Sequence, residues 1–188
     1  MSAPHHLPEI VQRAFDLSRR SGFVSFCRNE TGRLLAALAA SRTGTLAELG
    51  TGTGVGAAWL RAGLAPGARI VTAELDARLA DTAAEVFAGD GRVDVLAADW
   101  QALVERAPFS LLFCDSSLPE ASNPATLAAL MEPGGMVVVD DFVPSGTWPP
   151  LVDGQVDTLR QAWLEHPDFI ACQVQVTEDA AVVIASRR

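Results

Sequence analysis

The sequence has 188 residues, of which 49% are hydrophobic and 20% charged, a balance typical of one globular domain. A formal net charge of −9 argues against a nucleic-acid-binding surface, and no apolar run reaches the ~18 residues of a membrane span. The first residues lack the basic and apolar segments of a signal peptide, and the three cysteines form no C-x-x-C pair. We therefore expect a cytoplasmic protein with no nucleic-acid and no membrane partner.

Along the chain, apolar residues recur at helical spacing in some segments and form short continuous runs in others. The segments expected to be helical are 7–20, 30–41, 57–64, 77–88, 101–106, 119–131 and 155–166. The expected strands are 45–50, 68–75, 92–97, 110–115, 136–140, 169–177 and 180–186. Asn29 and Asp76 can cap the second and fourth helices, while Cys114 and Cys172 lie in apolar runs that indicate core thiols.

Strands and helices alternate through most of the sequence, which predicts an α/β fold with a parallel sheet covered by helices on both faces. The last two strands are separated only by Glu178 and Asp179. A two-residue connection can join antiparallel strands only, so a hairpin closes the chain. No repeat or linker divides the sequence, so we expect one domain over 1–188, with the helices of 1–43 packed on it as an N-terminal extension.

A glycine-rich turn follows the first strand and leads directly into a helix. In this turn four glycines alternate with other residues, in the order Gly50, Thr51, Gly52, Thr53, Gly54, Val55, Gly56. Glycine permits positive φ and a close approach of backbone N–H groups to a ligand, and the helix adds its positive end. We infer a ligand-binding turn, since a plain connection would not need four such residues.

Glu48, two residues before the turn, indicates which ligand binds. The dinucleotide fingerprint G-x-G-x-x-G/A fits 52–57 only by starting late in the turn. An acid at the end of the first strand repels a pyrophosphate but suits an ammonium group. With Glu48 and Gly50, the stretch resembles the first motif (E/D-x-G-x-G-x-G) of class I S-adenosylmethionine-dependent methyltransferases, which implies S-adenosyl-L-methionine (SAM) as the cofactor.

Further acids stand at the ends of the second and third strands, where an open α/β sheet binds its ligands. Glu74 can accept both hydrogen bonds of a ribose diol, a device that nicotinamide enzymes share. Asp99 can accept from the exocyclic amine of adenine, and Trp100 offers either a face for the purine or simple packing. Any one of these acids could instead cap the following helix. The resemblance implies cofactor contacts at Val24, Ser25 and Leu75 as well.

Asp115, Asp140 and Asp141 end the fourth and fifth strands. Three converging carboxylates cannot all stay ionised without a cation, and hard oxygen ligands indicate Mg²⁺, Mn²⁺ or Ca²⁺. Neighbours in a regular strand point to opposite faces, so Asp140 and Asp141 converge only if the strand ends between them. The alternative is that Asp141 caps a helix and Asp115 binds only the cofactor's amine.

These residues narrow the resemblance to the cation-dependent O-methyltransferases of the catechol and caffeoyl-CoA type. That family implies a Rossmann-like seven-stranded sheet of order 3-2-1-4-5-7-6, a metal held by Asp115 and Asp140, and an Asn where this chain has Asp141. The family's base, a lysine three residues after the fourth-strand Asp, is replaced by Leu118, and the chain contains no lysine at all. We therefore assign no catalytic residue beyond the metal site.

The sequence thus predicts a SAM-dependent O-methyltransferase that acts on a small hydroxylated acceptor with assistance from Mg²⁺. The alternatives are a SAM-binding module without turnover, which Leu118 favours, and a nicotinamide-dependent oxidoreductase, which Glu48 and Asp99 disfavour. Family resemblance also suggests a homodimer, in which the helix at 7–20 would offer its apolar face either to its own domain or to a second subunit.

Overall fold

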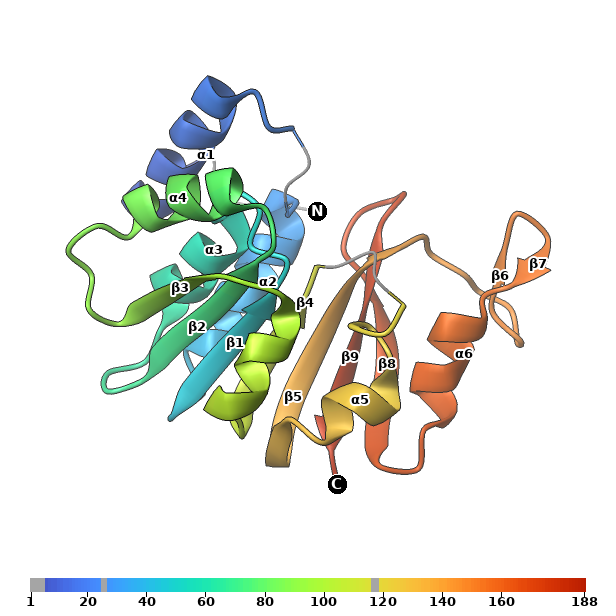
Figure 1. The fold of residues 1–188 in the computed structure, drawn as a ribbon. Helices are drawn as coiled ribbons and strands as arrows, with labels where there is room; N and C mark the ends of the chain where they lie inside the picture. Colours follow the sequence, from blue (N-terminus) through green and yellow to red (C-terminus); the bar gives the residue numbers. More distant parts are fainter. Residues whose placement is uncertain (1–5, 25–26, 116–118) are drawn as a thin grey trace.

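The computed structural model describes residues 6–24, 27–115 and 119–188, and its helices and strands alternate along the chain (Figure 1). The helices are α1 (Glu9–Ser21), α2 (Asn29–Ala39), α3 (Val55–Gly63), α4 (Ala77–Val86), the 3-10 helix η1 (Trp100–Arg106), α5 (Pro124–Ala128) and α6 (Thr158–Glu165). The strands are β1 (Thr45–Leu49), β2 (Arg69–Glu74), β3 (Val93–Ala97), β4 (Phe109–Cys114), β5 (Met131–Phe142), β6 (Leu151–Val152), β7 (Gln155–Val156), β8 (Phe169–Gln175) and β9 (Ala181–Arg187). Within these described ranges no helix is long and apolar enough to cross a membrane.

The main sheet has seven strands in the order β3-β2-β1-β4-β5-β9-β8. Strands β1 to β5 pair in parallel, whereas β9 runs antiparallel to both β5 and β8. This confirms the α/β class, the closing hairpin and the strand order that the resemblance implied. A separate two-stranded sheet, β6–β7, lies between β5 and α6 and was not predicted.

Helices cover both faces of the sheet, and each face has its own apolar core. Alternate residues of one strand enter different cores, as Leu46 and Ala47 of β1 do, because side chains of a strand point alternately to its two faces. Helix α1 contributes Val11 and Phe15 to the first core and packs against α3 and α4. Its apolar face is therefore buried within its own chain.

Several predicted boundaries are wrong because capping residues were overlooked. The helix expected at 119–131 is only α5, where the Asn123 side chain accepts hydrogen bonds from two N–H groups and Pro124 occupies the first turn. The helix expected at 155–166 starts at Thr158, because Asp157 caps it. Asp76 caps α4 as predicted, but Asn29 lies inside α2 and caps nothing.

The fifth strand is also longer than the 136–140 that apolar residues mark out, since β5 runs from Met131 to Phe142. Cys114 is buried as predicted, whereas Cys172 is exposed on β8 and is not a core thiol. Strand β8 lies at the edge of the sheet, so one of its faces is covered less completely than the apolar pattern suggested.

Candidate active site

The glycine-rich turn leads from β1 into α3 at the carboxyl edge of the sheet. Gly50, Gly52 and Gly54 have φ of 85°, 52° and 90°, a region that other residues rarely adopt. A side chain at Gly56 would be excluded by space, because an added Cβ would lie 2.2 Å from Oε1 of Glu48. The alternating glycines are thus required by backbone conformation at the start of the turn and by close packing at its end.

Glu48 lies beneath this turn and is almost completely buried. Its Oε2 accepts a hydrogen bond of 2.6 Å from the Thr72 hydroxyl, which is itself hydrogen-bonded to the hydroxyl of Thr51. Burial raises the pKa of Glu48 well above its usual range, while the hydrogen bond from Thr72 opposes that shift. The carboxyl group supports the turn from below and is not part of the cavity wall, so its predicted contact with an ammonium group stays a prediction.

Glu74, at the end of β2, faces the turn from the side. Its Oε2 accepts from the Gly52 N–H at 2.8 Å, and its Oε1 accepts from the Asp76 N–H at 2.9 Å. Each oxygen keeps a second lone pair, so the carboxylate is held in place and can still accept two hydrogen bonds from a diol.

A cavity with about 610 Å³ of empty space, part of it open to solvent, lies above the turn. Six residues predicted to bind the cofactor line it: Gly50, Thr51, Gly52, Gly56, Glu74 and Asp115. Five lining residues were not predicted: Phe23, Cys27, Thr53, Val55 and Leu79. Thr53 and Val55 belong to the glycine-rich turn itself, so a prediction that covered the whole turn would have included them.

The other predicted contact residues that the structure describes lie outside the cavity wall. Val24 and Leu75 are 85% and 70% exposed. Asp99 is exposed and its carboxylate accepts from the Gln101 N–H at 2.9 Å, so it caps η1. Trp100 is partly buried and packs against the second core. Gly54 is the N-cap of α3, and Ser25 lies outside the described residues.

Two of the three predicted metal ligands, Asp140 and Asp141, form a β-bulge near the end of β5. Strand β5 pairs with β9 up to Val139 and again at Phe142, and two residues of β5 lie opposite one of β9 in between. Asp141 has φ of 66°, and its N–H donates to Oδ1 of Asp140 at 2.9 Å. The strand therefore does not end between the two acids as expected; the bulge (Asp140 and Asp141) redirects them instead.

The bulge brings negative charge close to Asp115, which follows β4. Burial and the charges of Asp140 and Asp141 raise the pKa of Asp115 to about 7. Burial also raises the pKa of Asp140, and burial together with these acids raises the pKa of the Cys27 thiol well above its usual range. The acids therefore repel one another, as the sequence predicts, and Cys27 lies next to them.

The closeness of these acids does not by itself make a metal site. Among residues 6–24, 27–115 and 119–188, no three or more His, Cys, Asp or Glu side chains are arranged so that they could hold a metal ion. The carboxylate oxygens of Asp115, Asp140 and Asp141 are the donor type that Mg²⁺ prefers, but their positions are not those of a formed site. Leu118, which replaces the family's lysine, lies outside the described residues.

The fold is shared with solved O-methyltransferases. One from Bacillus cereus, in complex with SAH, is 20% identical, with a TM-score of 0.77 over 98% of this chain and 93% of its own. TomG from Streptomyces achromogenes, an O-methyltransferase of tomaymycin synthesis in complex with SAM, is 25% identical, with a TM-score of 0.76 over 97% and 91%. The SAH-bound methyltransferase PaMTH1 from Podospora anserina is 18% identical, with a TM-score of 0.73 over 98% and 90%. No family model matches the sequence, and no curated protein sequence does.

Proposed function

We propose that this chain is a SAM-dependent O-methyltransferase acting on a small hydroxylated acceptor. One observation carries the proposal: the cavity above the glycine-rich turn, with Glu74 fixed at its wall, opens at the carboxyl edge of a sheet whose fold O-methyltransferases share. The match to TomG over 97% of the chain supports the same activity.

The cavity offers a different chemical group to each part of SAM. The glycine-rich turn presents backbone N–H groups, and the Glu74 carboxylate can accept from the ribose hydroxyls. Asp115 lies in the same cavity and, when ionised, can pair with the ammonium group of the methionine part. SAM supplies a methyl group already activated on a sulfonium, so the protein mainly has to hold the acceptor oxygen in line with it.

The proposal includes assistance by Mg²⁺ held by the three acids at the ends of β4 and β5. Burial and then repulsion from Asp140 and Asp141 raise the pKa of Asp115. A cation would neutralise that repulsion and would lower the pKa of an acceptor hydroxyl in a chain without lysine. Binding would require Asp115, Asp140 and Asp141 to turn towards one ion. Isothermal titration of the SAM-loaded protein with Mg²⁺ tests this directly, and no heat at millimolar Mg²⁺, Mn²⁺ or Ca²⁺ would refute it.

The central experiment measures SAM and SAH binding by titration calorimetry and SAH formation with a panel of catechols and simple phenols. We expect Glu74→Ala to weaken SAM binding by about 10-fold or more, since the ribose loses its acceptor and the turn loses a support. Glu105→Ala, which removes an exposed carboxylate, is the matched control. SAM binding without SAH formation from any acceptor would favour the non-catalytic module, and binding of NAD in place of SAM would favour the oxidoreductase.

A further inference from the structure

Phe142 directly follows the bulge formed by Asp140 and Asp141, at the point where β5 pairs with β9 again. This ring is buried, and the guanidinium carbon of Arg160, on α6, lies 5.1 Å from its centroid. The Arg160 side chain is 1% exposed, so a charged group reaches from α6 into the interior beside the end of β5.

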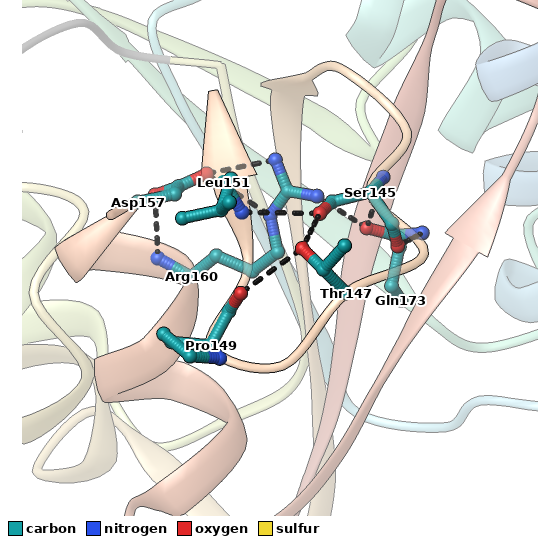
Figure 2. Close-up of polar contacts among 7 residues, drawn as sticks. All are labelled: Ser145, Thr147, Pro149, Leu151, Asp157, Arg160 and Gln173. Atoms are coloured by element: carbon teal, nitrogen blue, oxygen red, sulfur yellow. Dashed lines mark hydrogen bonds and ion pairs between the residues drawn. The ribbon is translucent and has the colours of Figure 1, made fainter. Parts of the chain in front are cut away.

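The Arg160 guanidinium is hydrogen-bonded to Asp157, the N-cap of its own helix, and to Gln173 on β8 (Figure 2). Its Nε and Nη2 donate to one oxygen of Asp157 at 3.0 and 2.7 Å, and its Nη1 donates to Oε1 of Gln173 on β8. The guanidinium therefore links the start of α6, the edge strand β8 and the ring that follows the bulge.

Gln173 extends this link to the main chain that leaves the bulge. Its Oε1 accepts from the Ser145 N–H at 3.3 Å, and its Nε2 donates to the Ser145 carbonyl at 3.2 Å, as a neighbouring strand would (Figure 2). The Ser145 hydroxyl in turn accepts from the Leu151 N–H at 3.1 Å. Residues 142–145 are thus held at Phe142 by Arg160 and at Ser145 by Gln173.

Anchoring α6 does not require this arrangement. Trp163 on the same helix is completely buried and donates to the Ser122 carbonyl at 2.9 Å. A buried ion pair contributes little net stability compared with apolar packing. It does fix geometry, because the N–H groups of a guanidinium donate in one plane only.

We propose that Arg160 is a positioning residue, acting with Gln173 to hold the β5 bulge and so to fix where Asp140 and Asp141 lie relative to Asp115. What these acids do rests on the proposed methyltransferase function, but their placement does not. Asp141 has a φ of 66°, a left-handed conformation that Asp adopts more readily than most non-glycine residues. The contacts of Arg160 with Phe142 and of Gln173 with Ser145 restrain the residues that directly follow it.

The test uses the full chain, labelled with ¹³C and ¹⁵N, and two variants. Gln173→Glu keeps the acceptor for Arg160 but cannot donate to the Ser145 carbonyl; Arg160→Lys keeps the charge but loses the fork. Gln175→Glu is the matched control, since Gln175 is an exposed glutamine two residues further along β8. Arg106→Lys controls for the loss of a guanidinium in an exposed ion pair.

In both variants we expect the Asp141 amide to exchange about 10-fold faster and the ¹³Cγ signal of Asp140 to shift, while the control variants match the native protein. The SAM dissociation constant should stay within about 2-fold, because the glycine-rich turn is untouched. Faster exchange of the Ser145 amide, with unchanged exchange at Asp141 and an unchanged ¹³Cγ signal of Asp140, would overturn the proposal. No change at any of the three residues would overturn it as well. If native protein fails to bind SAM, the proposed function fails while this result still stands.

Discussion

Asp115 is the residue whose ionisation should be visible in the stability of the whole protein. Its folded pKa of about 7 is far above the usual value of 3.8, so the folded state binds the proton more tightly than the unfolded state does. The contribution of Asp115 to the free energy of unfolding therefore falls by up to ~4 kcal/mol as pH rises from about 4 to about 7, and it stays constant above that.

Replacing this carboxyl group should remove its own share of the pH dependence, while Glu48 and Asp140, whose pKa values burial also raises, keep theirs. We expect Asp115→Asn to be more stable than the native protein without cofactor at pH 8, and the difference to shrink towards pH 5. Urea denaturation at both pH values measures it, with the exposed Asp81→Asn as control. An equal difference at the two pH values would show that burial and the neighbouring acids do not raise this pKa.

Sequence spacing located the parts of the site that are local in the chain. Gly52 and Glu74 lie on consecutive βαβ elements, and the parallel sheet brings the ends of neighbouring strands together. Phe23 and Cys27 could not be found in this way, because they reach the cavity from the segment between α1 and α2. Only the packing of those helices on α3 places that segment, and no local pattern encodes it.

At the scale of elements, helices α2 and α3 pack unusually closely at Gly63. A Cβ at this position would lie 1.9 Å from the carbonyl oxygen of Ala36, a backbone atom that cannot move independently of its helix. We expect Gly63→Ala to lower the free energy of unfolding by about 1–3 kcal/mol through overpacking, despite the better helix propensity of alanine.

Gly91 provides the matched substitution for this test. It has no atom within 4 Å of an added Cβ and no positive φ, so Gly91→Ala should change stability by less than about 0.5 kcal/mol. Equal stability of the two variants in urea denaturation would mean that α2 can move away from α3 without loss.

The β5 bulge is a feature that the local sequence does not predict. The apolar run before Asp140 predicts a strand, but the position of an extra residue depends on pairing with β9, about forty residues later in the chain. The hairpin β6–β7 was missed for a similar reason. Its strands have two residues each, too few to form a periodic pattern, and their place is fixed by contacts such as that between Leu151 and Ser145.

For the molecule as a whole, cofactor binding should raise the melting temperature. At a concentration 100 times its dissociation constant, SAM should add about 2.7 kcal/mol to the free energy of unfolding. For a domain of this size that raises the melting temperature by roughly 5–11 °C. NAD should give no shift. A shift with NAD and none with SAM in the same thermal scan would reverse the proposed cofactor.

The homodimer remains a prediction, and of the two packings expected for the helix at 7–20 the structure shows the one within its own chain. The apolar face of α1 is buried against α3 and α4, so any pairing must use other surfaces. Light scattering at tens of micromolar protein should give twice the mass of one chain. The mass of a single chain under these conditions would contradict the homodimer.

The order of strands has a consequence for how the protein is made. Strand β9 lies between β5 and β8 in the sheet, but it follows β8 in the chain. Strand β8 is therefore synthesised before β9, the strand that links it to the sheet. During that interval β5 presents an unpaired edge along Val137, Val138 and Val139, a run suited to incorrect pairing between nascent chains. We expect chaperones to bind there, and slow codons between β5 and β9 to lower the yield of active protein.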